Sequence, residues 1–139
     1  MKQLISLIFL INYTLAYEFK LNGKDIKYIN NSDKKSFIEN RLDKYKNLKI
    51  QVKDYELIKK LSYINSFVNK ILPAYDTSTQ ASLDYWATPK EFLLQGHGDC
   101  EDYVITKYFT LLEVGIPKEK LYFAIVDIKG QKDPHMILL

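Results

Sequence analysis

The chain has 139 residues, 47% of them hydrophobic and 27% charged, which predicts one small globular domain. This composition excludes a collagen-like, low-complexity or intrinsically disordered chain. The formal net charge of +3 is unevenly spread, with +6 over residues 17–72 and −4 over residues 73–139. Because lysine supplies nearly all the positive charge and no nucleic-acid-binding motif is present, we interpret the basic half as a solvated helical surface and expect no nucleic-acid partner.

The first 16 residues have the pattern of a secretory signal peptide. Lys2 is the only charged residue before Glu18, residues 4–11 are almost entirely apolar, and residues 14–16 (Thr-Leu-Ala) form a small-x-small cleavage site. The apolar run is shorter than the roughly 20 residues that a membrane-spanning helix needs. We therefore predict cleavage after residue 16 and a mature domain over residues 17–139; an uncleaved anchor and a buried strand are the alternatives.

The N-terminal half of the mature chain predicts a hairpin and two helices. Residues 17–29 alternate weakly around Asn22-Gly23, which favours a hairpin. A helical pattern begins at Ser32, and a second one follows Asp54 as N-cap and ends at Pro73. The apolar faces expected of the two helices are Phe37, Ile38, Leu42 and Tyr45, and Leu57, Ile58, Leu61, Ile64, Phe67, Val68 and Ile71.

The C-terminal half predicts one strong helix followed by strands. Residues 74–98 are irregular apart from a short helix near residues 90–94, and the strong helix runs from Cys100 to Val114 with Gly115 ending it. The apolar run over residues 121–128 predicts a buried strand, residues 130–133 a turn, and His135 the start of a second strand. Helices followed by antiparallel strands indicate an α+β fold.

Cys100 is the only cysteine. Since exported proteins usually pair their cysteines, a lone thiol is either a small buried apolar residue or chemically active. Glycines precede it and a helix begins at it, and free amides at a helix start lower the pKa of a thiol and bind an oxyanion. Of the two histidines, His135 lies on a different element and is the preferred general base, whereas His97 is interpreted as a loop residue.

Three carboxylates adjoin the thiol in sequence: Asp99, Glu101 and Asp102. By like-charge repulsion they raise the pKa of Cys100, which opposes the effect of the helix start. Two interpretations remain open. The carboxylates cap the helix and complement its dipole, or they hold a cation, for which an all-oxygen ligand set favours Ca²⁺ over Zn²⁺.

Four separated motifs, in this order, resemble the bacterial transglutaminase-like cysteine proteinases, which include the LapG-type periplasmic proteases. They are residues 84–93 (DYWATPKEFL), 98–103 (GDCEDY), 107–111 (KYFTL) and 134–136 (PHM). The resemblance covers roughly residues 50–139. It implies a papain-like or transglutaminase-like core, in which the helix that begins with the nucleophile Cys100 packs on an antiparallel sheet and His135 is the general base.

The resemblance also implies a cofactor and partners. It implies Ca²⁺ held by Asp99, Glu101 and Asp102, a periplasmic location, a large surface adhesin as the protein substrate, and control by an inner-membrane receptor for cyclic di-GMP. Trp86 lies in the matching tryptophan motif, so Trp86 and Gly98 are candidates for a substrate-contacting loop. For Trp86, a packed loop anchor is the alternative.

In one respect the sequence departs from the family pattern. The family's third catalytic residue is an aspartate on the strand after the histidine. This sequence has none at a matching position, because Asp127 and Asp133 precede His135 and the chain ends at Leu139. We therefore expect a C-terminally incomplete domain and sheet. A cysteine endopeptidase is the leading hypothesis; an acyl transferase using the same thiol and a catalytically inactive binding module are the alternatives.

Overall fold

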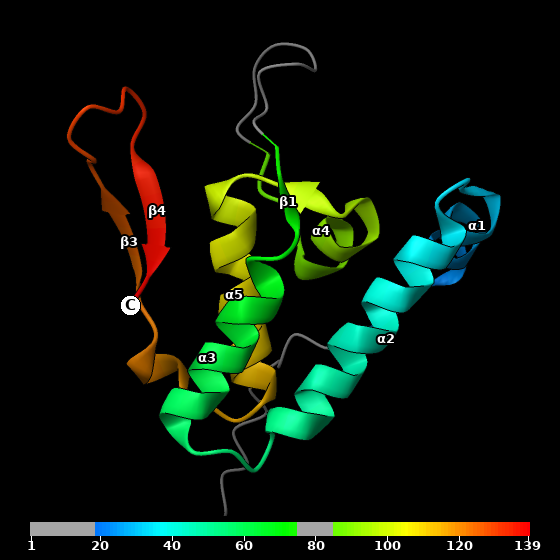
Figure 1. Cartoon of the computed structure of the whole chain (residues 1–139), viewed down its shortest axis with the longest axis horizontal. Coiled ribbons are helices and arrows are strands. Elements are labelled where there is room, and N and C mark those ends of the chain that lie inside the picture. The colour runs from blue at the N-terminus through cyan, green and yellow to red at the C-terminus, as the bar shows by residue number, and fades with distance from the viewer. Residues whose placement is uncertain (1–18, 75–84) are drawn as a thin grey trace, which may run out of the picture.

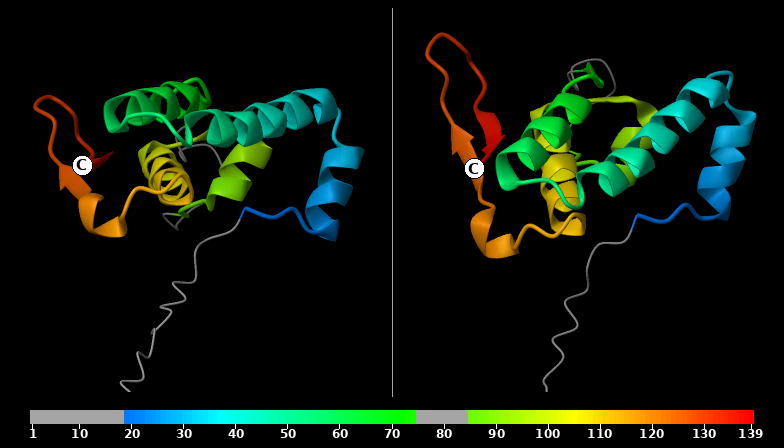
Figure 2. Two further views of the ribbon diagram at one scale, coloured as in Figure 1. Left: turned by 90° about the horizontal axis from the view of Figure 1, so that it is seen from below. Right: turned by 60° about the horizontal axis from the view of Figure 1, so that its bottom comes forward.

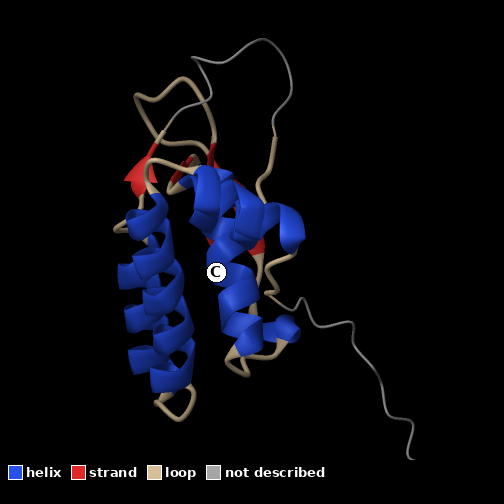
Figure 3. Ribbon diagram, turned by 90° about the vertical axis from the view of Figure 1, so that its right-hand side faces the viewer, coloured by secondary structure: helices blue, strands red, loops and turns tan. Residues whose placement is uncertain are grey.

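The computed structural model describes residues 19–74 and 85–139. The expected signal peptide, its cleavage site and residues 75–84 lie outside the described residues. Helices make up most of the fold, and the strands are short segments (Figure 3). None of the helices in the described ranges combines the length and the apolar character that crossing a bilayer requires.

The first helix, α1 (Gly23–Asn31), stands where the alternation around Asn22-Gly23 predicts a hairpin. Asn22 is its N-cap, with Oδ1 accepting the backbone N–H groups of Lys24 and Asp25 at 2.9 and 3.0 Å. Asp25 Oδ2 accepts the N–H of Asn22 at 2.7 Å in return. The hairpin prediction is wrong because Asn22 is followed three residues later by an acidic residue, and that pair forms a capping box.

Two longer helices follow, α2 (Lys35–Val52) and α3 (Leu57–Val68). Both expected helices are present, but their ends differ from the prediction. Ser32 is the C-cap of α1 rather than the start of α2, and Glu56 rather than Asp54 is the N-cap of α3. Helix α3 ends at Val68, whereas Pro73, the residue expected to end it, lies in β1.

The expected apolar faces of these helices are only partly buried. Tyr45 and Ile64 are almost fully buried, whereas Phe37 is 70% exposed and Ile58 is 77% exposed. Leu57 and Ile58 begin α3 at the edge of the fold, so the burial predicted for them is wrong. Sequence spacing identifies a stripe on a helix, but the neighbouring helices decide how wide the buried part is.

Two further helices lead to the C-terminal strands. α4 (Pro89–Gln95) matches the short helix expected near residues 90–94, and α5 (Cys100–Glu113) matches the strong one. Gly115 follows α5 with φ +91°, the left-handed conformation expected where a helix ends at glycine. A single 3₁₀ turn, η2 (Lys118–Lys120), then connects to the strands.

Within the described residues, four short strands form two small sheets. β1 (Leu72–Pro73) pairs in parallel with β2 (His97–Gly98), and β3 (Phe123–Val126) pairs antiparallel with β4 (His135–Leu138). The apolar run predicts a buried strand, yet Ile125 in β3 is 70% exposed. The reason is that β4 lies between β3 and α5, which leaves β3 as the outer strand (Figure 1). The fold class is α+β as expected, with small and incomplete sheets.

The core lies between the helices rather than against a sheet. Its fully or nearly fully buried members come from α2, α3, α4, α5 and the segments beside them: Tyr45, Leu48, Val52, Ile64, Val68, Ile71, Ala87, Phe92, Leu93, Leu111, Val114 and Leu121. The Tyr45 and Thr110 hydroxyls lie 2.9 Å apart, so the buried phenol is satisfied inside the core. Figure 2 shows the β3–β4 hairpin at one end of this helical body and α1 at the other.

Candidate active site

The thiol stands at the start of α5. Cys100 is the first helical residue, Asp99 is the N-cap, and the thiol is partly exposed. Cys100 Sγ donates a hydrogen bond to Glu101 Oε2 at 3.2 Å. The sequence therefore predicts the local placement of this residue, on a helix end where backbone amides lack partners within the helix.

Strand β4 brings His135 to the thiol from 35 residues further along the chain. The backbone N–H of Met136, the next residue in β4, is close enough to the Cys100 thiol to lower its pKa, and His135 is close enough to Glu101 to lower the pKa of that carboxyl. His97 lies in β2, is exposed, and does not line the cavity that contains Cys100. The structure thus places His135, and not His97, beside the thiol.

A cavity of about 1430 Å³ opens beside these residues. It lies between α3, the face of α5 from Cys100 to Leu111, the β1–β2 pair, and β4 with the loop before it. Cys100 and His135 both line it, together with Lys107 from α5 and Asn65 from α3. This volume is above the range of about 300–1,000 Å³ that is typical of small-molecule pockets.

The charges around the thiol disfavour its ionisation. Burial raises the pKa of Cys100, and the hydrogen bond to Glu101 and the charges of Glu101 and Asp99 raise it further, against the Met136 amide, which lowers it. The lowered thiol pKa expected from the helix start is therefore not found. The opposing expectation, that adjacent carboxylates raise this pKa, describes the site better.

Asp99 and Glu101 form a carboxyl pair. Burial raises the pKa of Asp99 to about 7, with further contributions from its hydrogen bond to Glu101 and from the charges of Asp102 and Glu101. Burial also opposes ionisation of Glu101, but hydrogen bonds from Asp99, its own backbone and Cys100, and the charge of His135, hold its pKa below the ordinary value. The two carboxyl groups are therefore coupled, with the pKa of Asp99 raised and the pKa of Glu101 lowered.

Two of the three expected calcium ligands fit a cation. Asp99 Oδ1 is buried without a hydrogen-bond partner, and Glu101 lies against the same carboxyl group. Hard carboxylate oxygens of this kind suit Ca²⁺. Within residues 19–74 and 85–139, however, no group of three or more His, Cys, Asp or Glu side chains is arranged to hold a metal ion.

The third expected ligand, Asp102, holds the backbone of two other segments. Its side chain is buried; Oδ1 accepts the N–H of Ala87 at 2.7 Å and Oδ2 accepts the N–H of Asp99 at 3.3 Å. Asp102 therefore joins the loop before α4 to the start of α5. Sequence reasoning assigns this carboxylate to a metal or to the helix dipole and misses this link.

Glycines allow the backbone to approach these side chains closely. A Cβ on Gly98 would lie 2.5 Å from Asp102 Oδ2 and 2.7 Å from the Phe92 ring. Gly96 has φ +77°, and its open side faces the Arg41 guanidinium, whose Nε donates to the Leu93 carbonyl at 2.7 Å. The glycine before the nucleophile, expected in a substrate-contacting loop, is thus required first of all by packing.

Trp86 lies on the loop that Asp102 holds. Its side chain is 50% exposed, which is not the burial of a packed loop anchor. On one side of it Tyr85 donates to Glu91 Oε1 at 2.8 Å, and on the other Ala87 donates to Asp102. Sequence reasoning misses Glu91 and Tyr85; the only available signal is the Thr88–Glu91 spacing of a capping box.

Neither nearby aspartate of the C-terminal hairpin occupies an obvious third catalytic position. Asp133 lines the cavity but is exposed, and Asp127 is exposed beyond the end of β3. Among the described residues, neither Asp127 nor Asp133 forms a hydrogen bond or an ion pair with His135. The third residue of a catalytic triad is accordingly not assigned within the described chain.

Comparison with known proteins gives consistent results. The family profile of the bacterial transglutaminase-like cysteine proteinases matches residues 27–139. Among solved structures, EGTA-treated LapG of Legionella pneumophila is 35% identical with a TM-score of 0.69 and covers 83% of this chain and 61% of its own. Calcium-bound LapG of the same organism is also 35% identical, with a TM-score of 0.66 over 83% of this chain and 62% of its own. No curated protein sequence matches the chain.

The chain thus spans a little over three fifths of the length of the LapG structures that it matches. The similarity includes the helix that begins at Cys100 and the strand that carries His135, since both fall within the matched residues. Because the family profile covers most of its length, the chain belongs to the bacterial transglutaminase-like cysteine proteinases.

Proposed function

We propose that the protein is an exported, calcium-dependent cysteine endopeptidase in which Cys100 is the nucleophile and His135 the general base. The observation that carries the proposal is the meeting of the α5 N-terminus with β4, where the Met136 amide contacts the thiol and His135 is the adjacent residue. A nucleophile at a helix end and a base on a separate strand form the arrangement that thiol catalysis requires.

The reaction follows from these positions. His135 takes the thiol proton, and Cys100 Sγ attacks the peptide carbonyl while the free amides at the start of α5 stabilise the oxyanion. The carbon–nitrogen bond breaks as His135 returns the proton to the leaving amine, which leaves a thioester. Water, deprotonated by His135, then attacks the thioester, releasing the carboxylate product and restoring the thiol.

The carboxylates explain why calcium belongs in the proposal. Without a cation, Glu101 holds the thiol proton in a hydrogen bond and raises the pKa of Cys100 together with Asp99. Asp99 and Glu101 would hold the ion, whose positive charge would offset the negative charge that disfavours the thiolate. The calcium-bound form of the related LapG supports this choice of ion.

The substrate, location and partner are part of the same proposal. A protease of this family acts on a protein substrate, and the resemblance of the four motifs points to a large surface adhesin. The N-terminal signal pattern supports export, and the proposed setting is the periplasm, under control of an inner-membrane receptor for cyclic di-GMP.

The chemistry can be tested without a known substrate. In EGTA, iodoacetamide should alkylate Cys100 more slowly than a free thiol with a pKa near 8.5, because the pKa of Cys100 is raised. Added Ca²⁺ should accelerate the reaction, and Asp99→Asn should weaken that response. A labelling rate that is indifferent to Ca²⁺ would show that no cation acts on this thiol.

The two histidines provide matched variants for the catalytic test. With a fragment of the adhesin encoded in the same genome as substrate, His135→Gln should abolish cleavage while His97→Gln, at an exposed position, should leave it intact. Mass spectrometry of the products separates the alternatives. A new N-terminus indicates hydrolysis, an amine cross-link indicates acyl transfer, and binding without a product indicates an inactive module.

A further inference from the structure

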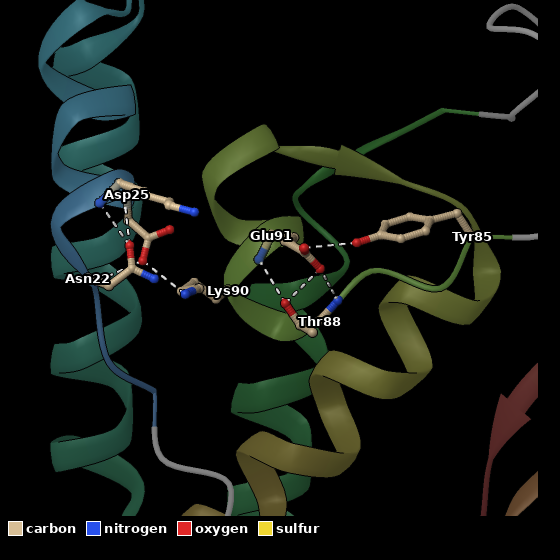
Figure 4. Close-up of polar contacts among 7 residues, drawn as sticks. Asn22, Asp25, Tyr85, Thr88, Lys90 and Glu91 are labelled. Atoms are coloured by element: carbon tan, nitrogen blue, oxygen red, sulfur yellow. Dashed lines mark hydrogen bonds and ion pairs between the residues drawn. The ribbon is translucent and has the colours of Figure 1, made fainter.

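Two separate carboxylates, Glu91 and Asp102, hold the loop that carries Trp86. Glu91, in the first turn of α4, accepts the Tyr85 hydroxyl through Oε1 at 2.8 Å. Its other oxygen, Oε2, accepts both the N–H and the hydroxyl of Thr88 at 2.8 Å (Figure 4). Glu91 thus fixes the residues on both sides of the segment 86–87.

The second carboxylate fastens the same loop to the nucleophile's helix. Asp102 Oδ1 accepts the N–H of Ala87 at 2.7 Å, and Oδ2 accepts the N–H of Asp99, the N-cap residue before Cys100. Ala87 is 2% exposed, so this bond is shielded from water. This buried hydrogen bond therefore fixes the position of the loop relative to the start of α5.

Between these attachments the Trp86 side chain remains 50% exposed. A large aromatic side chain on a rigid backbone presents apolar area at low cost in conformational entropy. A loop that served only to pack the core would bury the indole, as the neighbouring Ala87 is buried. The hydrogen bonds instead hold the backbone and leave the ring available.

We propose that Glu91, through Tyr85 and Thr88, is a positioning residue that holds Trp86 as a fixed recognition surface for an apolar side chain of the polypeptide substrate. This inference rests on the proposed function: Trp86 does not line the cavity that holds the thiol, so the polypeptide must extend from the cleft past the start of α5 to reach it. Tyr85 is the part of the arrangement that can be changed alone, because the Thr88–Glu91 capping box does not depend on it.

The first test measures the position of Trp86 directly, because it is the only tryptophan in the chain. Tyr85→Phe should lower the fluorescence anisotropy of Trp86 and increase its quenching by acrylamide, with the melting temperature nearly unchanged. The matched control is Tyr122→Phe, which removes an exposed hydroxyl bonded to the Glu119 carbonyl at 2.7 Å in the β3–β4 region. Wild-type fluorescence in Tyr85→Phe would overturn the positioning role.

The second test separates recognition from thiol reactivity. It compares the rates at which benzyloxycarbonyl-Phe-Ala-fluoromethyl ketone and iodoacetamide alkylate Cys100 in the full chain with Ca²⁺ present. Loss of an aromatic contact should slow the peptidyl reagent about threefold to tenfold in Trp86→Ala, with a smaller loss in Tyr85→Phe, and leave the iodoacetamide rate unchanged. Tyr122→Phe should change neither rate.

The outcomes distinguish this inference from the proposed function. If iodoacetamide fails to label Cys100 in the folded wild type, the nucleophile assignment fails, while the fluorescence comparison still decides the role of Tyr85 and Glu91. If the peptidyl reagent reacts with Trp86→Ala at the wild-type rate, the recognition role of Trp86 is overturned with the nucleophile intact.

Discussion

Replacing Asp102 by asparagine tests the link between the Trp86 loop and the nucleophile's helix. The carboxylate is 6% exposed and accepts two backbone N–H groups, from Ala87 and from Asp99. An asparagine side chain keeps one carbonyl oxygen for one of these donors and turns an NH₂ group toward the other. One buried or partly buried amide then loses its acceptor, and the remaining hydrogen bond loses the strength that a charged acceptor provides.

The magnitude follows from those two changes. Leaving a buried donor unsatisfied and weakening a charge-assisted bond together cost about 2–3 kcal/mol of unfolding free energy. For a chain of 139 residues, with about 3–4 °C of melting temperature per kcal/mol, Asp102→Asn should melt roughly 6–12 °C below the wild type.

The assay is thermal unfolding followed by circular dichroism, with EGTA present so that no bound cation contributes to stability. The control is Asp43→Asn, which removes the same charge at an exposed position of α2 and should change the unfolding free energy by less than about 0.5 kcal/mol. If Asp102→Asn were no less stable than this control, the buried carboxylate would not hold the two amides and the reasoning would be refuted.

Three further predictions concern single contacts. Lys60→Met should cost about 2 kcal/mol in urea unfolding, because the buried Nζ donates to the Lys53 and Val114 carbonyls at 2.9 and 3.0 Å; an unchanged midpoint would contradict this. Gly98→Ala should destabilise by about 1–3 kcal/mol because its Cβ meets Asp102 and Phe92, whereas Gly23→Ala, with nothing within 4 Å, should not destabilise. Burial raises the pKa of Glu91, but hydrogen bonds from Thr88 and Tyr85 outweigh it and hold this pKa below 4.5. Ionised Glu91 therefore stabilises the fold above pH 4.5. This stabilisation is lost as the pH falls through the pKa of Glu91 in the folded state. The stability deficit of Glu91→Gln, measured by urea titration, should therefore shrink below pH 4.5, and a deficit that persists in acid would show that the charge is not the cause.

Several parts of the fold could be predicted because their signals are local. The start of α5 at Cys100, its end at Gly115 and the short helix α4 each depend on a cap, a glycine or a proline within a few residues. At Asn22 the local signal gave the wrong prediction, because Asn-Gly favours a hairpin turn while asparagine also favours the N-cap of a helix. Only the neighbouring structure decides between two local solutions of similar energy.

Burial could not be read from the apolar pattern with the same success. Ile125 and Ile58 lie in runs that predict a core, yet they are 70% and 77% exposed. A strand or a helix face is buried only where another element covers it, and β3 lies outside β4 while the first turn of α3 lies at the edge (Figure 1). Whether another element covers a segment depends on the whole fold and cannot be read from the sequence of that segment alone.

The site divides in the same way. The sequence alone identifies Cys100 as the only thiol, places it at a helix start, and restricts the base to His97 or His135. The tertiary structure decides that β4 brings Met136 and His135 to the thiol, that Asp102 holds two backbone amides, and that Glu91 fixes the residues beside Trp86. The physical reason is that residue types set which chemistry is available, whereas hydrogen bonds between segments far apart in the chain form only after the core has packed those segments together.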